Sequence, residues 1–187
     1  MADSWYEAVP GNAPLLQGDF ILNCPLLAWT DDAEIKGENE AEELSSQWEV
    51  VGEDVLVMTQ GCDLEQNKVS EIVVCSMHTL AEVRELWEKR EQNPNEKGWR
   101  TFFTKIRSGH IWNYTVLNKG EAGELQTDHR IVDFHNIATI PIKYLNTIAE
   151  RRGPRLRLRS PYCEHLSQSF ARYFMRVGLP VSVDDPW

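Results

Sequence analysis

The sequence has no run of eighteen apolar residues, which is about the length that a membrane-spanning helix requires. Its first sixteen residues contain no basic residue and no apolar stretch, so they do not resemble a secretion signal. With 187 residues, of which 42% are hydrophobic, the chain is long enough for one core and short for two. We therefore expect a single cytoplasmic domain.

Cysteine is scarce, and its four copies lack the CxxC spacing of a structural zinc site. They are Cys24, Cys62, Cys75 and Cys163. We interpret them mainly as small buried apolar thiols and expect neither a cofactor nor a metal. Two alternatives with a bound metal remain. One is a zinc site made from cysteines and histidines that are distant in the sequence, and the other is a facial triad of metal ligands. The triad would use His129, Asp133 and His135, which would share one face of a strand.

Basic residues are almost missing from the first third of the chain. Residues 1–65 contain fifteen acids and only Lys36 as a base, whereas the rest contains fourteen acids and eighteen bases. Many of these acids lie in residues 31–46, which we expect to form a mobile loop or a frayed helix. Such asymmetry favours a basic partner, although a solvated acidic loop would give the same composition.

Apolar periodicity predicts an α+β domain over residues 17–180, preceded by an extended N-terminal arm (1–16) and followed by a tail (181–187). The predicted strands are 19–24, 47–51, 55–59, 70–76, 112–117 and 130–134. Pro25 would end the first of them, and a tight turn at Gly52–Asp54 would join the second and third. The predicted helices start at Thr79, run over 96–107, and lie around 143–150. The strands at 55–59 and 70–76 are nearly all apolar, so we expect them to be central.

The C-terminal part predicts an extended segment followed by an amphipathic helix. Arginine and leucine alternate over Arg155–Arg159, as in a half-exposed strand. Ser160 is a suitable N-cap, and Pro161 suits the first turn. The apolar stripe of this helix is Leu166, Phe170, Phe174 and Val177, and Gly178 and Pro180 would end it.

A basic cluster precedes and lines this helix. Its members are Arg155, Arg157 and Arg159, with Tyr162, His165, Arg172 and Arg176 on one side of the helix. Guanidinium groups bind phosphates and carboxylates bidentately, so we expect an anion or partner site here. Nucleic acid is one candidate ligand. The other is a carboxylate of the chain or of a partner, such as Asp63, Asp133 or the acidic loop.

Cys62 and Asp63 follow a predicted buried strand and lie at a glycine-containing turn. Cys62 is a candidate nucleophile, with His78, His135 or His165 as its base. The structural alternative, which we prefer, is that Cys62 packs at the rim and Asp63 caps a turn.

Several segments resemble the strands of MazF/PemK-like small barrels. They are Gly18–Ile21, Val55–Thr59, Ile72–Ser76, Arg130–Asp133 and Ile137–Ile140. Met58–Leu64 and Ser160–Pro180 are also similar to the "SQ-x-CDL" and "SPY-x-EHLSQ" stretches of bacterial proteins of this barrel type without an assigned activity. The resemblance implies a small SH3-like β-barrel with inserted helices and a C-terminal amphipathic helix. Barrels of this type are commonly dimeric, so the resemblance also implies a homodimer.

The toxins of that family are metal-independent endoribonucleases. Their active-site arginine lies in an "RP" pair where this chain has Glu53 and Asp54, and acids there repel a phosphate. We therefore favour a non-catalytic protein-binding module of a bacterial stress-response or phage-defence system, CRISPR-associated systems included. It would bind a partner with a basic surface through the acidic loop, the Arg-rich C-terminal surface and a Trp-rich surface (Trp29, Trp48, Trp87, Trp112). The alternative is an endoribonuclease of a toxin–antitoxin pair with an altered site drawn from Thr59, Cys62, Arg157 and His165.

Overall fold

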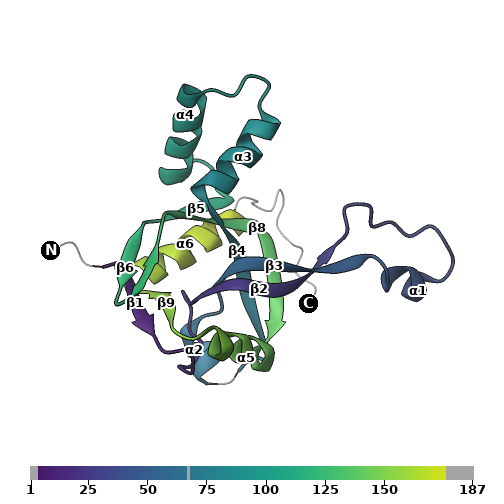
Figure 1. Cartoon of the computed structure of the whole chain (residues 1–187), viewed down its shortest axis with the longest axis horizontal. Helices are drawn as coiled ribbons and strands as arrows, with labels where there is room; N and C mark the ends of the chain where they lie inside the picture. Colours follow the sequence, from purple (N-terminus) through teal and green to yellow (C-terminus); the bar gives the residue numbers. More distant parts are fainter. Residues whose placement is uncertain (1–3, 67, 176–187) are drawn as a thin grey trace, which may run out of the picture.

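A computed structural model describes residues 4–66 and 68–175 (Figure 1). The strands in these residues are β1 (Tyr6–Val9), β2 (Phe20–Trp29), β3 (Trp48–Val57), β4 (Glu71–Thr79), β5 (Tyr114–Leu117), β6 (Gly120–Ala122), β7 (Leu125–Thr127), β8 (Arg130–Pro141) and β9 (Arg155–Leu158). The helices are α1 (Glu40–Leu44), α2 (Gly61–Glu65), α3 (Leu80–Arg90), α4 (Glu96–Arg107), α5 (Ile142–Arg152) and α6 (Tyr162–Phe174). None of these helices is long and apolar enough to cross a membrane.

The main sheet has five antiparallel strands in the order β2-β3-β4-β8-β5, which confirms the α+β class. Two smaller pairs, β1-β9 and β6-β7, complete the strands of the described residues. In this part of the chain the sheet is open, with β2 and β5 at its edges, so the expected closed barrel is not formed. The β1-β9 pair instead meets the start of β2 through a single bridge between Asp19 and Arg157.

Both faces of the sheet are covered, as the apolar strands predicted. Val55 and Val57 of β3 point to the face that carries α5, where they pack with Leu145. Leu56, between them, points to the opposite face, where Leu166 of α6 and the β1-β9 pair cover the sheet. This alternation is the period of two that a pleated strand imposes, and it places β3 and β4 at the centre of the core.

Two predicted breaks in the strands were wrong. β2 continues through Pro25, and β3 continues through Gly52, which is paired with Pro25 in the hairpin. Proline is tolerated here because β2 is an edge strand. A Cβ atom at Gly52 would lie 2.1 Å from Asn23 Oδ1, so this glycine allows a close approach between strands and does not form a turn. The two strands therefore form one long hairpin that extends away from the sheet (Figure 1).

The helices α3 and α4 agree with the sequence. Thr79 accepts a hydrogen bond from the Glu82 N–H, and the Glu82 carboxylate accepts one from the Thr79 N–H, which completes a capping box. The helix α4 has the predicted bounds, and Asn95 caps it through the Gly98 N–H. The two helices form a hairpin above the sheet (Figure 1), where Val83 and Ile106 pack on Ile131.

The C-terminal helix covers the sheet with a narrower stripe than expected. Leu166 is buried and Phe170 packs edge-on against Phe134, but Phe174 is 59% exposed. Ser160 does not cap the backbone of α6, because its hydroxyl donates to Glu164 Oε1 instead. The predicted stripe and stop residues Val177, Gly178 and Pro180 lie outside the described residues.

Replacing Leu166 with alanine tests the packing of α6. The change removes a buried anchor from the core, so we expect the free energy of unfolding to fall by about 2–5 kcal/mol. Urea denaturation followed by tryptophan fluorescence measures the loss. Phe174→Ala is the matched control, and it should change stability by less than about 0.5 kcal/mol because the ring is exposed. Equal losses in the two variants would contradict this orientation of α6.

Candidate functional site

The predicted half-exposed arginine run is largely inside the protein. Arg155 is buried and Arg157 is mostly buried, whereas Arg159 is exposed. The expectation of a basic surface along β9 was therefore wrong for two of its three residues. The reason is topological, because β9 pairs with β1 on one side and meets the start of β2 on the other.

Both guanidinium groups bind the fully buried carboxylate of Asp19. Arg155 Nε and Arg157 Nη2 each lie 2.9 Å from Asp19 Oδ2, and Arg157 Nε donates to Oδ1. The pairing of Arg157 is thus bidentate. The carboxylate also accepts a hydrogen bond from the Leu16 N–H, at 3.0 Å.

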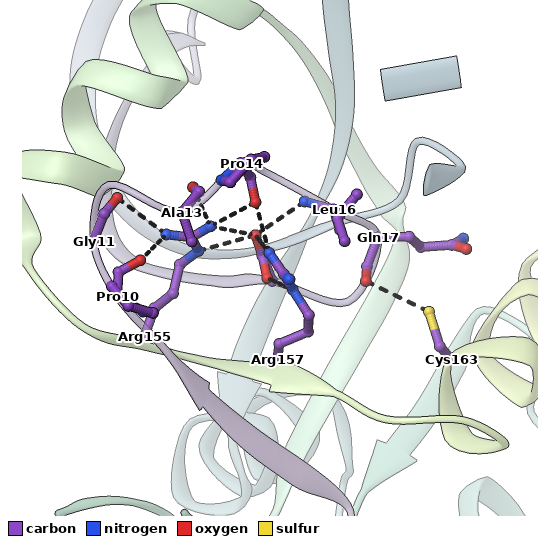
Figure 2. A network of polar contacts seen from close by, with 10 residues as sticks. Pro10, Gly11, Ala13, Pro14, Leu16, Gln17, Arg155, Arg157 and Cys163 are labelled. Atoms are coloured by element: carbon purple, nitrogen blue, oxygen red, sulfur yellow. Dashed lines mark hydrogen bonds and ion pairs between the residues drawn. The ribbon is translucent and has the colours of Figure 1, made fainter. Parts of the chain in front are cut away.

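The N-terminal segment completes this network. Arg155 donates to four backbone carbonyl oxygens, and Arg157 donates to one of the same four. The acceptors are Pro10, Gly11, Ala13 and Pro14. Figure 2 shows this segment curving around the guanidinium groups of Arg155 and Arg157. A phosphate could bind here only by displacing Asp19 or the carbonyls, so the geometry describes a structural ion cluster.

Neutralising Asp19 tests this cluster. Asp19→Asn leaves two buried or mostly buried guanidinium groups without their counter-ion, so we expect a loss of about 3–5 kcal/mol in the free energy of unfolding. Asp54→Asn is the matched control, because Asp54 pairs with Arg130 in a more exposed place, and we expect about 1 kcal/mol. Urea unfolding of both variants provides the comparison. A loss for Asp19→Asn no larger than for the control would refute the assignment.

The other residues of the predicted basic site do not gather around Arg155 and Arg157. Tyr162 stacks on Trp5 with ring centroids 4.0 Å apart, while His165 and Arg172 are exposed on α6. Arg176 lies outside the described residues. The suggested internal carboxylates are also engaged elsewhere. Asp63 pairs weakly with Lys68 at 3.9 Å, and Asp133 accepts hydrogen bonds from the His135 N–H and the Asn136 amide.

Thr59 and Cys62 lie in different local environments in the structure. Thr59 Oγ1 accepts a hydrogen bond from the Val73 N–H at 2.7 Å and so ties the end of β3 to β4. Cys62 is exposed in the first turn of α2, with Sγ 3.8 Å from oxygens of Gln60 and Asp63. His78 lies five residues beyond Val73 on β4, roughly 17 Å along the strand. Within the described residues, the polar contacts of Cys62 Sγ are with Gln60 and Asp63 and include no histidine.

Thiol labelling tests these cysteine environments. Burial raises the pKa of Cys75 to about 12, and the pKa values of Cys24 and Cys163 to about 11, whereas Cys62 is exposed. Since the thiolate is the reactive form, we expect one thiol per chain to react rapidly with a disulfide reagent at pH 8. Cys62→Ser should abolish this fast phase. Rapid reaction of a second thiol in the folded protein would contradict the raised pKa values of Cys24, Cys75 and the partly buried Cys163.

The facial-triad alternative was wrong. No group of three His, Cys, Asp or Glu side chains in residues 4–66 and 68–175 could hold a metal ion. The register of β8 shifts after Asp133, so His135 is exposed while Asp133 is buried. This irregularity breaks the alternation that would have put His129, Asp133 and His135 on one face.

The clearest candidate for a functional surface is an exposed apolar face on the β2–β3 hairpin. Leu27 is 70%, Trp29 65%, Trp48 46% and Val50 64% exposed. Leu27 is paired with Val50 and Trp29 with Trp48. Directly paired residues share a face of the ribbon, as do residues two apart, so these four side chains form one apolar face. We call residues 22–54 the acidic hairpin and these four residues its apolar face.

The base of the acidic hairpin is fixed by a polar network. Asn23 adopts φ 49° at a register shift in β2, and its N–H donates to Asp54 Oδ1 at 2.8 Å. Asp54 Oδ2 in turn accepts from Arg130 of β8, and Arg152 of α5 donates to the Asn23 carbonyl. Asp54 therefore orients the hairpin, at the position where the resemblance would place a catalytic arginine.

The tip of the acidic hairpin carries most of the acidic residues of that hairpin. Residues 30–46 include seven acids and one base, Lys36, and the predicted frayed helix is present as the five-residue α1. Lys36 Nζ pairs with Glu34, and its backbone N–H donates to Glu43. Figure 1 shows this tip extended well away from the rest of the molecule.

The predicted Trp-rich surface is divided. Trp87 is buried against Trp99 between α3 and α4, and Trp112 lies in the loop before β5, so only Trp29 and Trp48 share a face. The sequence does carry the missing signal, which is the alternation of Leu27 with Trp29 and of Trp48 with Val50 in two facing strands. No family model, curated protein or solved structure matches this chain.

Proposed function

We propose that this chain is a non-catalytic protein-binding module and that the acidic hairpin is its binding element. The exposed apolar face of four large side chains carries this proposal. Single exposed apolar residues are common, but a contiguous cluster on a projecting element is typical of an interaction site. The opposite side of the ribbon is covered at its base, where Cys24 is buried and Leu26 packs on the core beneath α5.

The chemistry of the hairpin defines the class of partner. Tryptophan side chains supply large contact areas and dominate the energetics of many interfaces. Acids around them select against acidic surfaces and accelerate encounter with basic ones. The partner is therefore a protein with an apolar patch or groove bordered by lysine or arginine.

The resemblance to MazF/PemK-like barrels suggests a setting in bacterial stress response or phage defence, where small binding modules act on toxins or effectors. Kinship with that barrel fold and a homodimeric state remain predictions. The endoribonuclease alternative has less support, because Arg157 is bonded to Asp19 and Thr59 holds a strand contact. His165 is exposed on α6, and Cys62 makes its polar contacts with Gln60 and Asp63.

Affinity capture tests the binding element. We expect the immobilised parent chain to retain specific proteins from a bacterial lysate. The Trp29→Ala/Trp48→Ala variant should retain at least tenfold less of each protein, as measured by quantitative mass spectrometry. Removing the two rings deletes the centre of the apolar face. Retention by the parent should also fall when salt is raised from 0.05 to 0.5 M, roughly a threefold shorter screening length.

Leu86→Ala is the matched control, because Leu86 is an exposed apolar residue on α3, outside the hairpin. It should retain the same proteins as the parent. Thermal melting of both variants checks that the fold is intact. If the tryptophan variant retains the same proteins in the same amounts as the parent, the acidic hairpin is not the binding element.

A further inference from the structure

A groove of about 960 Å³ lies between the end of α4, the strand β5 and the helix α6. Its apolar lining includes Phe103 of α4, Val116 of β5 and Trp5, which precedes β1. The residues come from segments far apart in the sequence, so the groove is a product of the tertiary fold.

The charge of this groove is opposite to that of most of the chain. Arg107, His129 and Arg172 line it, and no acidic residue is among its described lining residues. Arg107 and Arg172 are both exposed. In a chain with a formal net charge of -10, this is a local positive site with aromatic walls.

The floor of the groove is an edge strand. β5 pairs with β8 on one side only, and Asn113 O accepts from the Phe134 N–H. Because backbone groups alternate in direction along a strand, Tyr114 and Val116 direct theirs to the open side. The Tyr114 N–H is bonded to Ile111 O, which leaves the Tyr114 carbonyl and both groups of Val116 facing the groove. Such an edge accepts an added strand.

We propose that the β5 groove binds the acidic hairpin of a second copy of this chain. The inference rests on the proposed function and names the partner of the same binding element. The hairpin supplies what the groove lacks, which is seven acids at its tip and an apolar face with two tryptophans. It also supplies a strand edge, since β3 pairs with β4 only over Val55–Val57 and the outer part of β3 has an open side.

Charge and geometry select this arrangement over two others. Contact between two apolar faces would place two acidic hairpins against each other, and like charges would oppose it. Insertion of the hairpin into the groove of its own chain is excluded because its tip lies well away from β5 in Figure 1. The remaining arrangement joins two different surfaces, so a dimer keeps one free hairpin on one copy and one free groove on the other, and assembly continues or closes into a ring.

Sedimentation velocity tests the contact with two variants that each disable one surface. Trp29→Ala/Trp48→Ala removes the rings of the hairpin, and Arg107→Glu/Arg172→Glu reverses the charge of the groove. We expect the parent chain to form dimers and larger species as its concentration rises at 50 mM salt. Each variant alone should be monomeric. An equimolar mixture should form one-to-one dimers and nothing larger, because only one intact hairpin and one intact groove are available.

The matched control is Lys143→Glu/Arg151→Glu, which makes the same charge change on exposed residues of α5, outside the groove. It should assemble like the parent. Thermal melting of every variant confirms that it is folded. A parent that is monomeric at every concentration, a groove variant that assembles like the parent, or a mixture that stays monomeric would each overturn the inference. The proposed function fails separately, when the tryptophan variant captures the same lysate proteins as the parent.

Discussion

The buried contact of Asp19 with Arg155 and Arg157 is the interaction on which the rest of the structure depends. It joins the start of β2, the strand β9 and the N-terminal segment, which are distant in sequence. Two guanidinium groups around one carboxylate leave a positive charge, and the carbonyls of Pro10–Pro14 solvate it in place of water. The N-terminal segment is therefore a ligand of the core, and β1 is placed beside β9 as a consequence.

This closed network decides where function can lie. It engages Arg155 and Arg157 with a buried carboxylate and so removes these two charges from the surface. What remains outside the core is the acidic hairpin, with its base fixed by Asn23, Asp54 and Arg130, and the α3–α4 hairpin with the groove at its end. The charge asymmetry of the sequence is thus converted into two separate surfaces of opposite sign.

The sequence predicted the elements whose causes are local. The capping box at Thr79 and the bounds of α4 follow from residues within a turn of each other, and the structure agrees. It did not predict that Arg155 and Arg157 are internal, because their acceptors lie about 140 residues away in the chain. Pro25 and Gly52 were misread as breaks for a related reason. The rules that proline ends a strand and that glycine marks a turn consider only the local sequence. Here the pairing of Pro25 with Gly52 across the hairpin overrides both rules.

The hairpin itself gives a last physical argument for an interface. A two-stranded ribbon is marginally stable in water, and the outer part of this one, from Leu27 to Trp29 and from Trp48 to Val50, lies beyond the strands that support its base. Its four large side chains are exposed on one side and its acids repel one another at the tip. Under the proposed function, a partner that covers the apolar face and neutralises the acids would stabilise the hairpin, so binding and the stability of the tip would be linked. Stabilisation of this ribbon by contact is the physical argument behind the proposed binding role.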